Sequence, residues 1–418
     1  MAKIWCISAP LFSHTDWGGF LKTARELQLR GHDVTWISEE GLVGAVTNAG
    51  IPFKAVRKTG WLWPPPPPPD ISTLKPQEAV MLRYRRALDT WLTVDLVGEA
   101  VDALIALARE IGSPDMILTD PFLTAAALAA ESLGVPLIVC GWPALKDLDE
   151  DFLFPVQKAL GSDSQKRIER LKTRFGLSGT NLSQGATPSV LSPHLHICYW
   201  CETWYQADFA NLLPQTLFVG GRVEQISEPI PDWLNAIPQD APLALITLGT
   251  TFAGELGFFS WAAQAAARAG LIPIVVIGWN PYSPEQKAQL KAALPNSTRL
   301  LNWVNFAHVL PRTRVIVHHG GMGTTHWAVC YGVPQIIVPH AADQRGQARR
   351  AAQAKVGLNL TAHEVKNGML IDGIKALAAD ESVRRNALEL AAEMARLGGI
   401  SAAADAVVAM IEVLREGK

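Results

Sequence analysis

Residues 314–344 have the sequence RVIVHHGGMGTTHWAVCYGVPQIIVPHAADQ, and this stretch decides both the fold and the chemistry that we expect. It starts with Arg314 and then the apolar residues 315–317, which predict a buried strand that ends in two histidines. A glycine-rich turn follows, and we expect a helix to begin near Thr324. Glycine lets the backbone come close to a bulky anion, and the free N–H groups and dipole of a helix N-terminus favour phosphate. The stretch therefore predicts a phosphate site, with a plain tight turn as the alternative.

Polar side chains beside this turn can add hydrogen bonds to a phosphate. They are the hydroxyls of Thr324 and Thr325 and the imidazole of His318. The turn lacks the Gly-Lys-Ser/Thr ending of a Walker loop, and its glycines do not have the G-x-G-x-x-G spacing of a dinucleotide fold. The predicted site is therefore of neither of these two kinds.

The same alternation of apolar strands and helices extends in both directions from this stretch. In the second half of the chain the predicted strands are LALITL, PIVVI, RLLNWV, RVIVHH and QIIVP, and in the first half they are Ile4–Ala9, Val34–Ile37, Met116–Thr119 and Leu137–Cys140. Strands that are apolar on both faces and are joined by helices indicate parallel sheets. The 418 residues exceed what one core holds, and residues 218–233 resemble a linker. We predict an α/β protein with two doubly wound, Rossmann-like domains that face each other across a cleft, where a ligand is expected.

Composition excludes some classes of partner. The net charge of −2 gives no reason to expect a nucleic acid. The first residues show no signal peptide, and five scattered cysteines indicate reduced thiols, so we expect a cytoplasmic protein. The basic stretch Lys158–Arg174 leaves open a weak contact with an anionic membrane surface, although a solvated helix face is the commoner explanation.

Several motifs along nearly the whole chain resemble one enzyme family. They are ARELQLRGHDVTW (24–36), PDMILTDPFLTAAALAAESLGVP (114–136), HHGGMGTTHWAVCYGVPQIIVPHAADQ (318–344) and RLGGISAAADAVVAMIE (396–412). Together they resemble the family 1 glycosyltransferases of the GT-B superfamily, which include the UDP-glycosyltransferases. The HHGG-x-GTT form is most similar to the bacterial antibiotic and sterol glucosyltransferase branch.

The resemblance implies a domain order. Residues 1–218 would form an N-terminal acceptor-binding domain and residues 219–395 a C-terminal domain that binds a nucleotide-sugar donor. Residues 396–418 would form a C-terminal helix that crosses back to the first domain.

The resemblance also implies donor-binding residues. A pyrophosphate cradle would consist of His318, Gly320, Gly321, Met322, Gly323, Thr324 and Thr325. Asp343 and Gln344 match the pair that holds donor-sugar hydroxyls. The turn beside the phosphates would consist of Gly249, Thr250 and Thr251.

Three positions depart from the family pattern. Trp303 matches the tryptophan that stacks on the base, but its spacing to His318 is short, so a core tryptophan on a strand is the alternative. His326 stands where many members have a ribose-binding glutamate, which puts the ribose contact in doubt. Gln347 replaces the asparagine that usually follows the Asp-Gln pair.

Two residues compete for the role of catalytic base. Counted back from RGHDVTW without a gap, Asp16 falls at the base position that the antibiotic and sterol branch uses. Counted forward from the first strand, His14 falls there, and the pair Gly18–Gly19 would give the freedom that the resulting insertion needs. We favour His14, with Asp16 second. Asp120 resembles the aspartate that orients a catalytic histidine, with helix capping as its alternative role.

The implied reaction is an inverting, metal-independent transfer of a hexose, glucose first, from a UDP- or dTDP-sugar. The acceptor would be a hydroxyl of a lipophilic small molecule, and no metal or other cofactor is implied. Aromatic residues that could line its pocket are Trp17, Trp61, Trp63 and Trp142. The alternatives are a nucleotide-sugar epimerase of the same architecture and a non-catalytic nucleotide-sugar-binding accessory protein.

Overall fold

The computed structural model forms two compact units. The first consists of Met1–Tyr199, Ala210–Val219 and Gly398–Lys418, and the second of Trp200–Phe209 and Gly220–Leu397. The predicted boundaries differ by one or two residues, except that residues 200–209, assigned to the first domain from the sequence, belong to the second unit. The described residues are 1–16, 18–67, 69–70, 72–147, 155–185, 189–221, 223, 226, 228–249, 256–280, 282–340 and 343–416.

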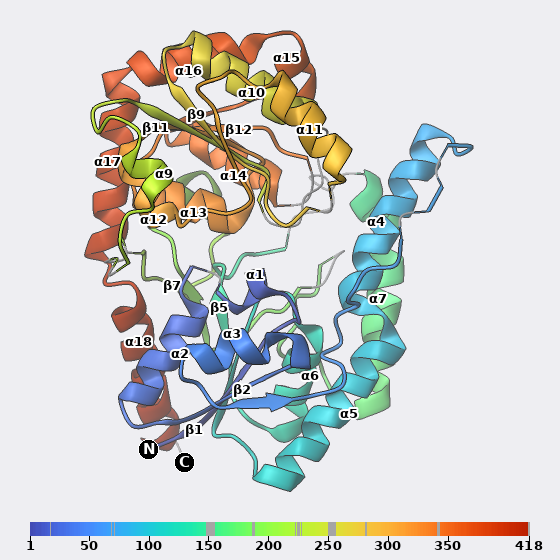
Figure 1. Ribbon diagram of the computed structural model, residues 1–418. Helices are drawn as coiled ribbons and strands as arrows, with labels where there is room; N and C mark the ends of the chain where they lie inside the picture. The colour runs from blue at the N-terminus through green and yellow to red at the C-terminus, as the bar shows by residue number, and fades with distance from the viewer. Residues whose placement is uncertain are drawn as a thin grey trace. The chain divides into compact units, whose positions relative to one another are not determined.

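The first unit contains a parallel sheet whose described part has seven strands in the order β3-β2-β1-β4-β5-β6-β7 (Figure 1). Successive residues of β1 enter two different apolar clusters, with Ile4 and Cys6 in one and Trp5 and Ile7 in the other. Both faces are buried, as the continuous apolar strands predicted. The strands are β1 (Lys3–Ile7), β2 (Asp33–Ser38), β3 (Phe53–Ala55), β4 (Met116–Thr119), β5 (Leu137–Gly141), β6 (Leu195–Cys198) and β7 (Thr216–Phe218).

Helices cover this sheet, and most carry one apolar face. The described helices of the first unit are α1 (Phe12–Thr15), α2 (Phe20–Leu29), α3 (Val43–Asn48), α4 (Pro76–Leu92), α5 (Val94–Ile111), α6 (Thr124–Leu133), α7 (Pro155–Phe175) and α18 (Ile400–Glu416). In α6, the seven residues from Thr124 to Ala130 are all buried, because small side chains let the helix lie close to the strands.

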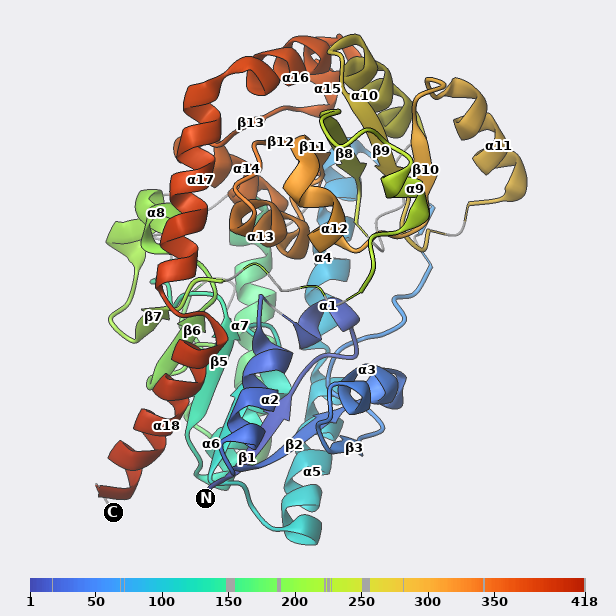
Figure 2. The ribbon, with the colours of Figure 1, turned by 60° about the vertical axis from the view of Figure 1, so that its left-hand side comes forward.

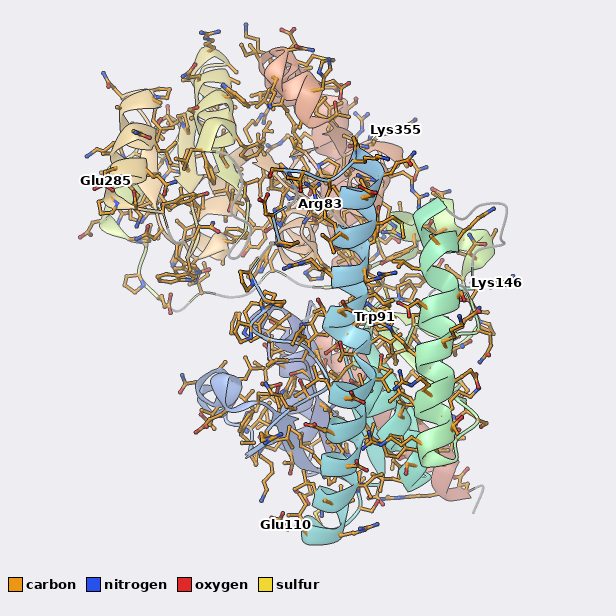
Figure 3. All side chains as sticks on the ribbon, turned by 90° about the vertical axis from the view of Figure 1, so that its right-hand side faces the viewer. Arg83, Trp91, Glu110, Lys146, Glu285 and Lys355 are labelled. Carbon is orange, nitrogen blue, oxygen red and sulfur yellow. The ribbon has the colours of Figure 1, made fainter. Side chains whose placement is uncertain are left out.

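Helices α4 and α7 lie side by side (Figure 3). Arg167 of α7 joins them through an ion pair with Asp89 at 2.7 Å. On α4, Arg86 donates hydrogen bonds to the carbonyls of Pro66 and Pro67 at 2.7 and 2.8 Å, which holds part of the proline run against the helix.

The basic face of α7 is partly neutralised within the unit. Lys172 pairs with Glu169 at 2.6 Å, and Arg174 pairs with Asp102 at 2.6 Å. These ion pairs reduce the charge that α7 could offer to an anionic membrane.

The second unit repeats the pattern. Its described residues form a six-stranded parallel sheet in the order β10-β9-β8-β11-β12-β13. All five strands predicted in this half are present. They are β8 (Leu243–Thr247), β9 (Ile272–Val276), β10 (Arg299–Leu301), β11 (Thr313–His318) and β12 (Gln335–Ile337), to which the structure adds β13 (Gly357–Asn359). The described helices are α8 (Glu202–Tyr205), α9 (Asp232–Asn235), α10 (Leu256–Arg268), α11 (Pro284–Ala293), α12 (Phe306–Val309), α13 (Met322–Cys330), α14 (Gln344–Gln353), α15 (Ala362–Lys366), α16 (Met369–Ala379) and α17 (Glu381–Arg396).

The C-terminal helix returns to the first unit, as the sequence predicted (Figure 2). Helix α18 packs against α2, and Ala403 and Val407 share an apolar cluster with Ala24 and Leu27. Residues 381–416 are long and apolar enough, by length and composition alone, to cross a membrane. Two glycines with positive φ, 92° at Gly398 and 60° at Gly399, separate α17 from α18 within this stretch.

Candidate active site

The glycine-rich turn lies between the end of β11 and the start of α13, at the carboxyl edge of the second sheet. Gly320 has φ of 89°, which favours glycine. A Cβ there would lie 2.7 Å from Cγ2 of Ile337 and 3.0 Å from the carbonyl oxygen of Gln344. Gly320 therefore lets the turn rest directly against the end of β12 and the start of α14, so both donor motifs share one edge.

His318, predicted to bind pyrophosphate, is fully buried. Its Nε2 donates to Oε1 of Gln335 at 3.0 Å, and its Nδ1 accepts from the backbone N–H of Gly320 at 3.1 Å. Burial, followed by the neighbouring His319, lowers the pKa of His318 to about 3, so the ring is neutral. Because protein groups use both ring nitrogens, the structure argues against the predicted contact of His318 with the donor.

His319, the next residue, lies beyond the strand. Its ring fills the space over two glycines. A Cβ on Gly249 would lie 2.8 Å from its Cε1, and a Cβ on Gly321 would overlap its Nε2. Burial, and then His340, lowers the pKa of His319 to about 4, so this ring is also neutral at pH 7. His319 therefore connects the turn after β8 with the turn after β11.

The first turn of α13 has one open position. A Cβ on Gly323 would have no atom within 4 Å, so ligand atoms have room beside this residue. By contrast, the Thr325 hydroxyl donates to the carbonyl of Gly321 at 2.9 Å and is buried. Met322 and Thr324 are also buried. Of the predicted cradle, Gly323 and the backbone N–H groups around it are thus the part open to a ligand.

The predicted sugar-binding pair begins α14. Asp343 occupies its N-cap position, and Oε1 of Gln344 accepts from the backbone N–H of His340 at 2.8 Å. Trp303, just after β10, is 57% exposed, which excludes the alternative of a core tryptophan. Thr250 and Thr251 lie outside the described residues.

His326 lies within α13. It is buried, its ring centroid lies 5.1 Å from that of Trp200 in an edge-on contact, and its Nδ1 lies 3.8 Å from Sγ of Cys330. A Cβ on Gly221 would lie 2.8 Å from the ring. These neighbours hold His326 within the unit, so its role as a replacement for a ribose ligand stays a prediction.

In the first unit, Asp120 follows β4 and is fully buried. Its Oδ2 accepts from the backbone N–H of Ala9 at 3.0 Å, and its Oδ1 accepts from that of Phe122 at 2.9 Å. Asp120 thus joins the segments that follow β1 and β4. The side chain of His14 lies outside the described part of the structure, so the predicted pairing with Asp120 is not tested.

Asp16 is the other candidate base, and its carboxyl group lies in a buried position. Its Oδ1 accepts no hydrogen bond from any residue that the structure describes. Burial raises the pKa of Asp16, and Lys22 partly offsets this rise. Asp16 as a whole is half-buried, and a carboxylate with one buried oxygen and a raised pKa is typical of a group that takes up a proton.

Tyr199 supports the segment after Asp16. It is fully buried, and its hydroxyl forms a 2.7 Å hydrogen bond with Oγ1 of Thr23. A Cβ on Gly19 would lie 2.9 Å from the Tyr199 ring, and φ is 75° at Gly18 and 155° at Gly19. Packing against Tyr199 therefore requires glycine at position 19, and the positive φ favours glycine at position 18, whichever residue is the base.

Aromatic side chains gather close to Asp120. Trp61 and Trp142 both meet Phe122 edge-on, with ring centroids 6.4 and 4.8 Å apart. All three are half-buried, and Trp63 is 38% exposed. Trp17 lies outside the described residues. Two of the four tryptophans predicted for an acceptor pocket, Trp61 and Trp142, thus contact the same residue, Phe122, which the sequence analysis did not single out.

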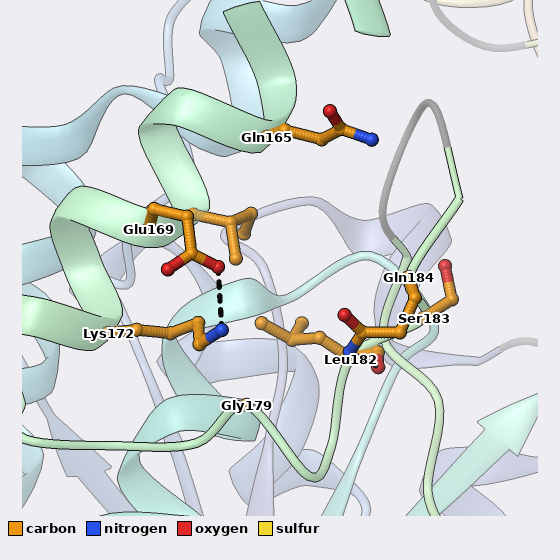
Figure 4. Close-up of a pocket in the computed structure, with 8 residues that line it drawn as sticks. Gln165, Glu169, Lys172, Gly179, Leu182, Ser183 and Gln184 are labelled. Atoms are coloured by element: carbon orange, nitrogen blue, oxygen red, sulfur yellow. Dashed lines mark hydrogen bonds and ion pairs between the residues drawn. The ribbon is translucent and has the colours of Figure 1, made fainter. Parts of the chain in front are cut away.

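A separate cavity of about 200 Å³ lies between α7 and residues 179–184 (Figure 4). Glu169 and Lys172, paired across one turn of α7, line it together with Leu182. It contains none of the predicted site residues. Among the described residues, no three His, Cys, Asp or Glu side chains are grouped as around a metal ion.

Comparisons with known proteins agree with this geometry. Residues 281–410 match the family described as "Erythromycin biosynthesis protein CIII-like, C-terminal domain". The chain is 27% identical to erythronolide mycarosyltransferase of Saccharopolyspora erythraea, over 91% of this chain and 93% of that protein. The solved structure of the kitacinnamycin glycosyltransferase superimposes with a TM-score of 0.74 at 21% identity, covering 98% and 99% of the two chains. The chain is a glycosyltransferase with the GT-B fold, and its matches support the predicted family 1.

A second solved structure shares this fold. The glycosyltransferase SsfS6 of Streptomyces sp. SF2575, complexed with thymidine diphosphate, has a TM-score of 0.63 at 21% identity and covers 97% of this chain and 99% of that one. This structure bears on the fold alone; the family match and the curated relatives, several of the antibiotic and natural-product type, support the predicted family.

Sequence reasoning did not single out His319 and Tyr199, which the structure places beside the predicted site residues, and one signal could have identified the first. A strand buried on both faces keeps its last residue, His318, in the core, whereas the next residue enters the carboxyl edge. In the doublet His318–His319, the second histidine is therefore the better candidate to lie at the carboxyl edge of the sheet. Tyr199 gave no comparable signal, because its neighbours Gly19 and Thr23 are far away in sequence.

Proposed function

We propose that this glycosyltransferase moves a hexose from a nucleoside-diphosphate donor to a hydroxyl group of a lipophilic small molecule, with inversion at the anomeric carbon. The donor is a UDP- or dTDP-sugar, and the protein acts in the cytoplasm without a metal ion. The proposal rests mainly on one observation. His319, the open position at Gly323 and the start of α14 all lie at the same edge of the second sheet.

The donor site stabilises negative charge that develops on the leaving diphosphate. The N-terminus of α13 presents backbone N–H groups, and its dipole favours an anion. His319 is neutral, so we propose that it contributes a hydrogen bond to the diphosphate rather than a full charge. Preorganised donors of this kind commonly stabilise the transition state of group transfer more than any other feature of an enzyme does.

Asp343 and Gln344 would hold the sugar hydroxyls, and Trp303 would stack on the base. The exposed indole of Trp303 supports this role, since a flat and solvent-accessible ring suits a nucleobase. The relative solved with thymidine diphosphate favours a thymine donor over a uracil donor. The transferred sugar is glucose or, as the name of the mycarosyltransferase relative suggests, a deoxyhexose.

We propose Asp16 as the base that takes the acceptor proton while the hydroxyl attacks the anomeric carbon. Its buried oxygen and raised pKa support this role, because a base of higher pKa removes a proton more effectively. The proposal revises our preference for His14. The argument for His14 used Gly18–Gly19 as a sign of an insertion, but packing against Tyr199 explains Gly19 without any insertion.

The aromatic group of Trp61, Phe122 and Trp142 would bind the acceptor. Half-buried rings offer apolar area, which suits a lipophilic alcohol or phenol. The name of the mycarosyltransferase, which acts on erythronolide, agrees with such an acceptor class.

The test is a panel of TDP- and UDP-sugars against lipophilic alcohols and phenols, with products identified by mass spectrometry. We expect a glycosylated acceptor and one equivalent of free nucleoside diphosphate. Conversion of the donor sugar without an acceptor would instead indicate an epimerase. Donor binding without turnover of any kind would indicate an accessory binding protein.

A further inference from the structure

We propose that residues 200–209 position the N-terminal turn of α14, and with it the pair Asp343–Gln344. Trp204 and Asp208 would be positioning residues for donor binding. The inference rests on the proposed donor site, and it assigns a role to a segment that lies outside every motif of the sequence.

The path of the chain is the first observation. Strands β6 and β7 are neighbours in the first sheet, and residues 199–215 connect them. A connection between parallel strands usually packs back on its own sheet. Here Trp200–Phe209 belongs to the second unit, where α8 lies beside α17 (Figure 2).

A buried hydrogen bond joins this segment to α14. Nε1 of Trp204 donates to Oε1 of Gln347 at 2.9 Å, and both residues are only 1% exposed. Gln347 lies three residues after Gln344, so both side chains are on the same face of the helix. The bond therefore fixes α14 one turn from the proposed sugar-binding residue.

Asp208 makes the second attachment, one further turn along α14. Its Oδ2 accepts from Nε of Arg350 at 2.9 Å and lies 2.8 Å from Nη2, and its Oδ1 pairs with Arg349. The Arg350 guanidinium also lies 4.2 Å from the ring centroid of Tyr205. Charge-assisted, two-point contacts and a stacked guanidinium fix orientation as well as distance.

The same segment contacts α13. Trp200 stacks on Trp204 with ring centroids 5.0 Å apart, and it meets His326 of α13 edge-on at 5.1 Å. Residues 200–209 thus touch both helices whose N-terminal turns would bind the donor. Because group transfer is sensitive to small errors in placement, loosening these contacts should weaken donor binding and slow transfer.

The experiment compares Trp204→Phe, Gln347→Leu and their combination. Phenylalanine keeps an aromatic ring on Trp200 but removes the N–H donor together with part of the indole ring, whereas Gln347→Leu removes the acceptor and keeps the indole. We expect each single change to raise the KM for a dTDP-sugar donor by about three- to tenfold. The Kd for thymidine diphosphate, which lacks the sugar that Asp343 and Gln344 would hold, and the KM for the acceptor should stay unchanged. The double variant should be little worse than either single variant, since both remove the same bond.

Thr313→Val is the matched control. It removes a buried 2.9 Å hydrogen bond to the carbonyl of Val309 at the opposite end of β11. It should lower the Tm without changing the KM for the dTDP-sugar donor. Hydrogen exchange at residues 344–347 should be faster in Trp204→Phe and unchanged in Thr313→Val.

Two results separate this inference from the proposed function. If the wild type binds thymidine diphosphate and His319→Ala weakens this binding, but Trp204→Phe and Gln347→Leu leave the KM for the dTDP-sugar donor unchanged, the positioning role is wrong and the donor site stands. If the wild type binds neither thymidine nor uridine diphosphate, the proposed function fails and the positioning role fails with it.

Discussion

The ring of His319 occupies the space that a side chain at Gly249 would need. A Cβ at Gly249 would lie 2.8 Å from Cε1 of His319, and the backbone at Gly249 has φ of 79°. Two turns from distant parts of the sequence, after β8 and after β11, are thus matched to each other through a neutral imidazole.

Gly249→Ala should displace His319 and raise the Kd for the donor nucleotide by about tenfold or more. Gly270→Ala is the control, because Gly270 also has φ of 79° but a Cβ there would have no atom within 4 Å. Both variants should lose about 1–2 kcal/mol of stability from the left-handed backbone. Equal Kd values for the two, measured by calorimetry, would contradict the role of His319.

The two histidines should respond differently to substitution. His319→Ala should reduce kcat/KM by roughly a hundredfold with little loss of stability, because it removes a contact to the leaving diphosphate. His318→Leu should lower the free energy of unfolding by about 1–3 kcal/mol, since it leaves Oε1 of Gln335 and the N–H of Gly320 without their partner. Steady-state kinetics and urea denaturation measure the two effects. The opposite pattern would restore His318 as the donor ligand.

Asp16→Asn should reduce kcat by about 10²- to 10⁴-fold with the donor KM preserved. The base must be ionised, so in the wild type kcat/KM should fall as the pH drops through a pKa above the ordinary aspartate value. His14→Gln tests the alternative base in parallel. A large loss in His14→Gln together with near-normal turnover in Asp16→Asn would show that the histidine is the base.

Stability should decrease from pH 6.5 towards pH 4. Burial lowers the pKa of His196 to about 4, of His318 to about 3 and of His319 to about 4. The unfolded chain, with ordinary histidine pKa values, binds more protons in this range, so protonation favours unfolding. Each residue contributes about 1.4 kcal/mol per pH unit. Urea midpoints at pH 7, 6 and 5 measure the slope, which should become shallower in His196→Gln; a flat profile contradicts the prediction.

Phe122→Leu should raise the acceptor KM several-fold and leave the donor KM unchanged, because it removes the ring between Trp61 and Trp142. Phe175→Leu, a half-buried phenylalanine of the same unit, is the control. Kinetics with each substrate varied in turn distinguish the effects. An equal rise in the acceptor KM in both variants would indicate a general loss of packing.

Long apolar strands such as β8 and β11 were predictable, since continuous burial on both faces leaves a clear pattern. The three-residue edge strands β3, β7 and β13 were not predicted, whereas the equally short β10 and β12 were, because β10 and β12 lie in the longer apolar runs RLLNWV and QIIVP. The proposed exchange of His318 for His319 as the donor ligand depends on one residue of strand register. Register reverses the direction of every side chain and is set by neighbouring strands.

The sequence by itself determined the two-unit α/β fold, the return of the C-terminal helix and the glycine-rich turn between a strand and a helix, because these depend on local periodicity and on where glycines stand. Only the tertiary structure decided how His318 and His319 are held, why Gly249 and Gly19 are glycines, and that residues 200–209 belong to the second unit. Each of these depends on contacts between segments far apart in sequence, such as His319 with Gly249 and Trp204 with Gln347. Whether such segments meet is settled by the packing of whole sheets and helices, which no short stretch of residues encodes.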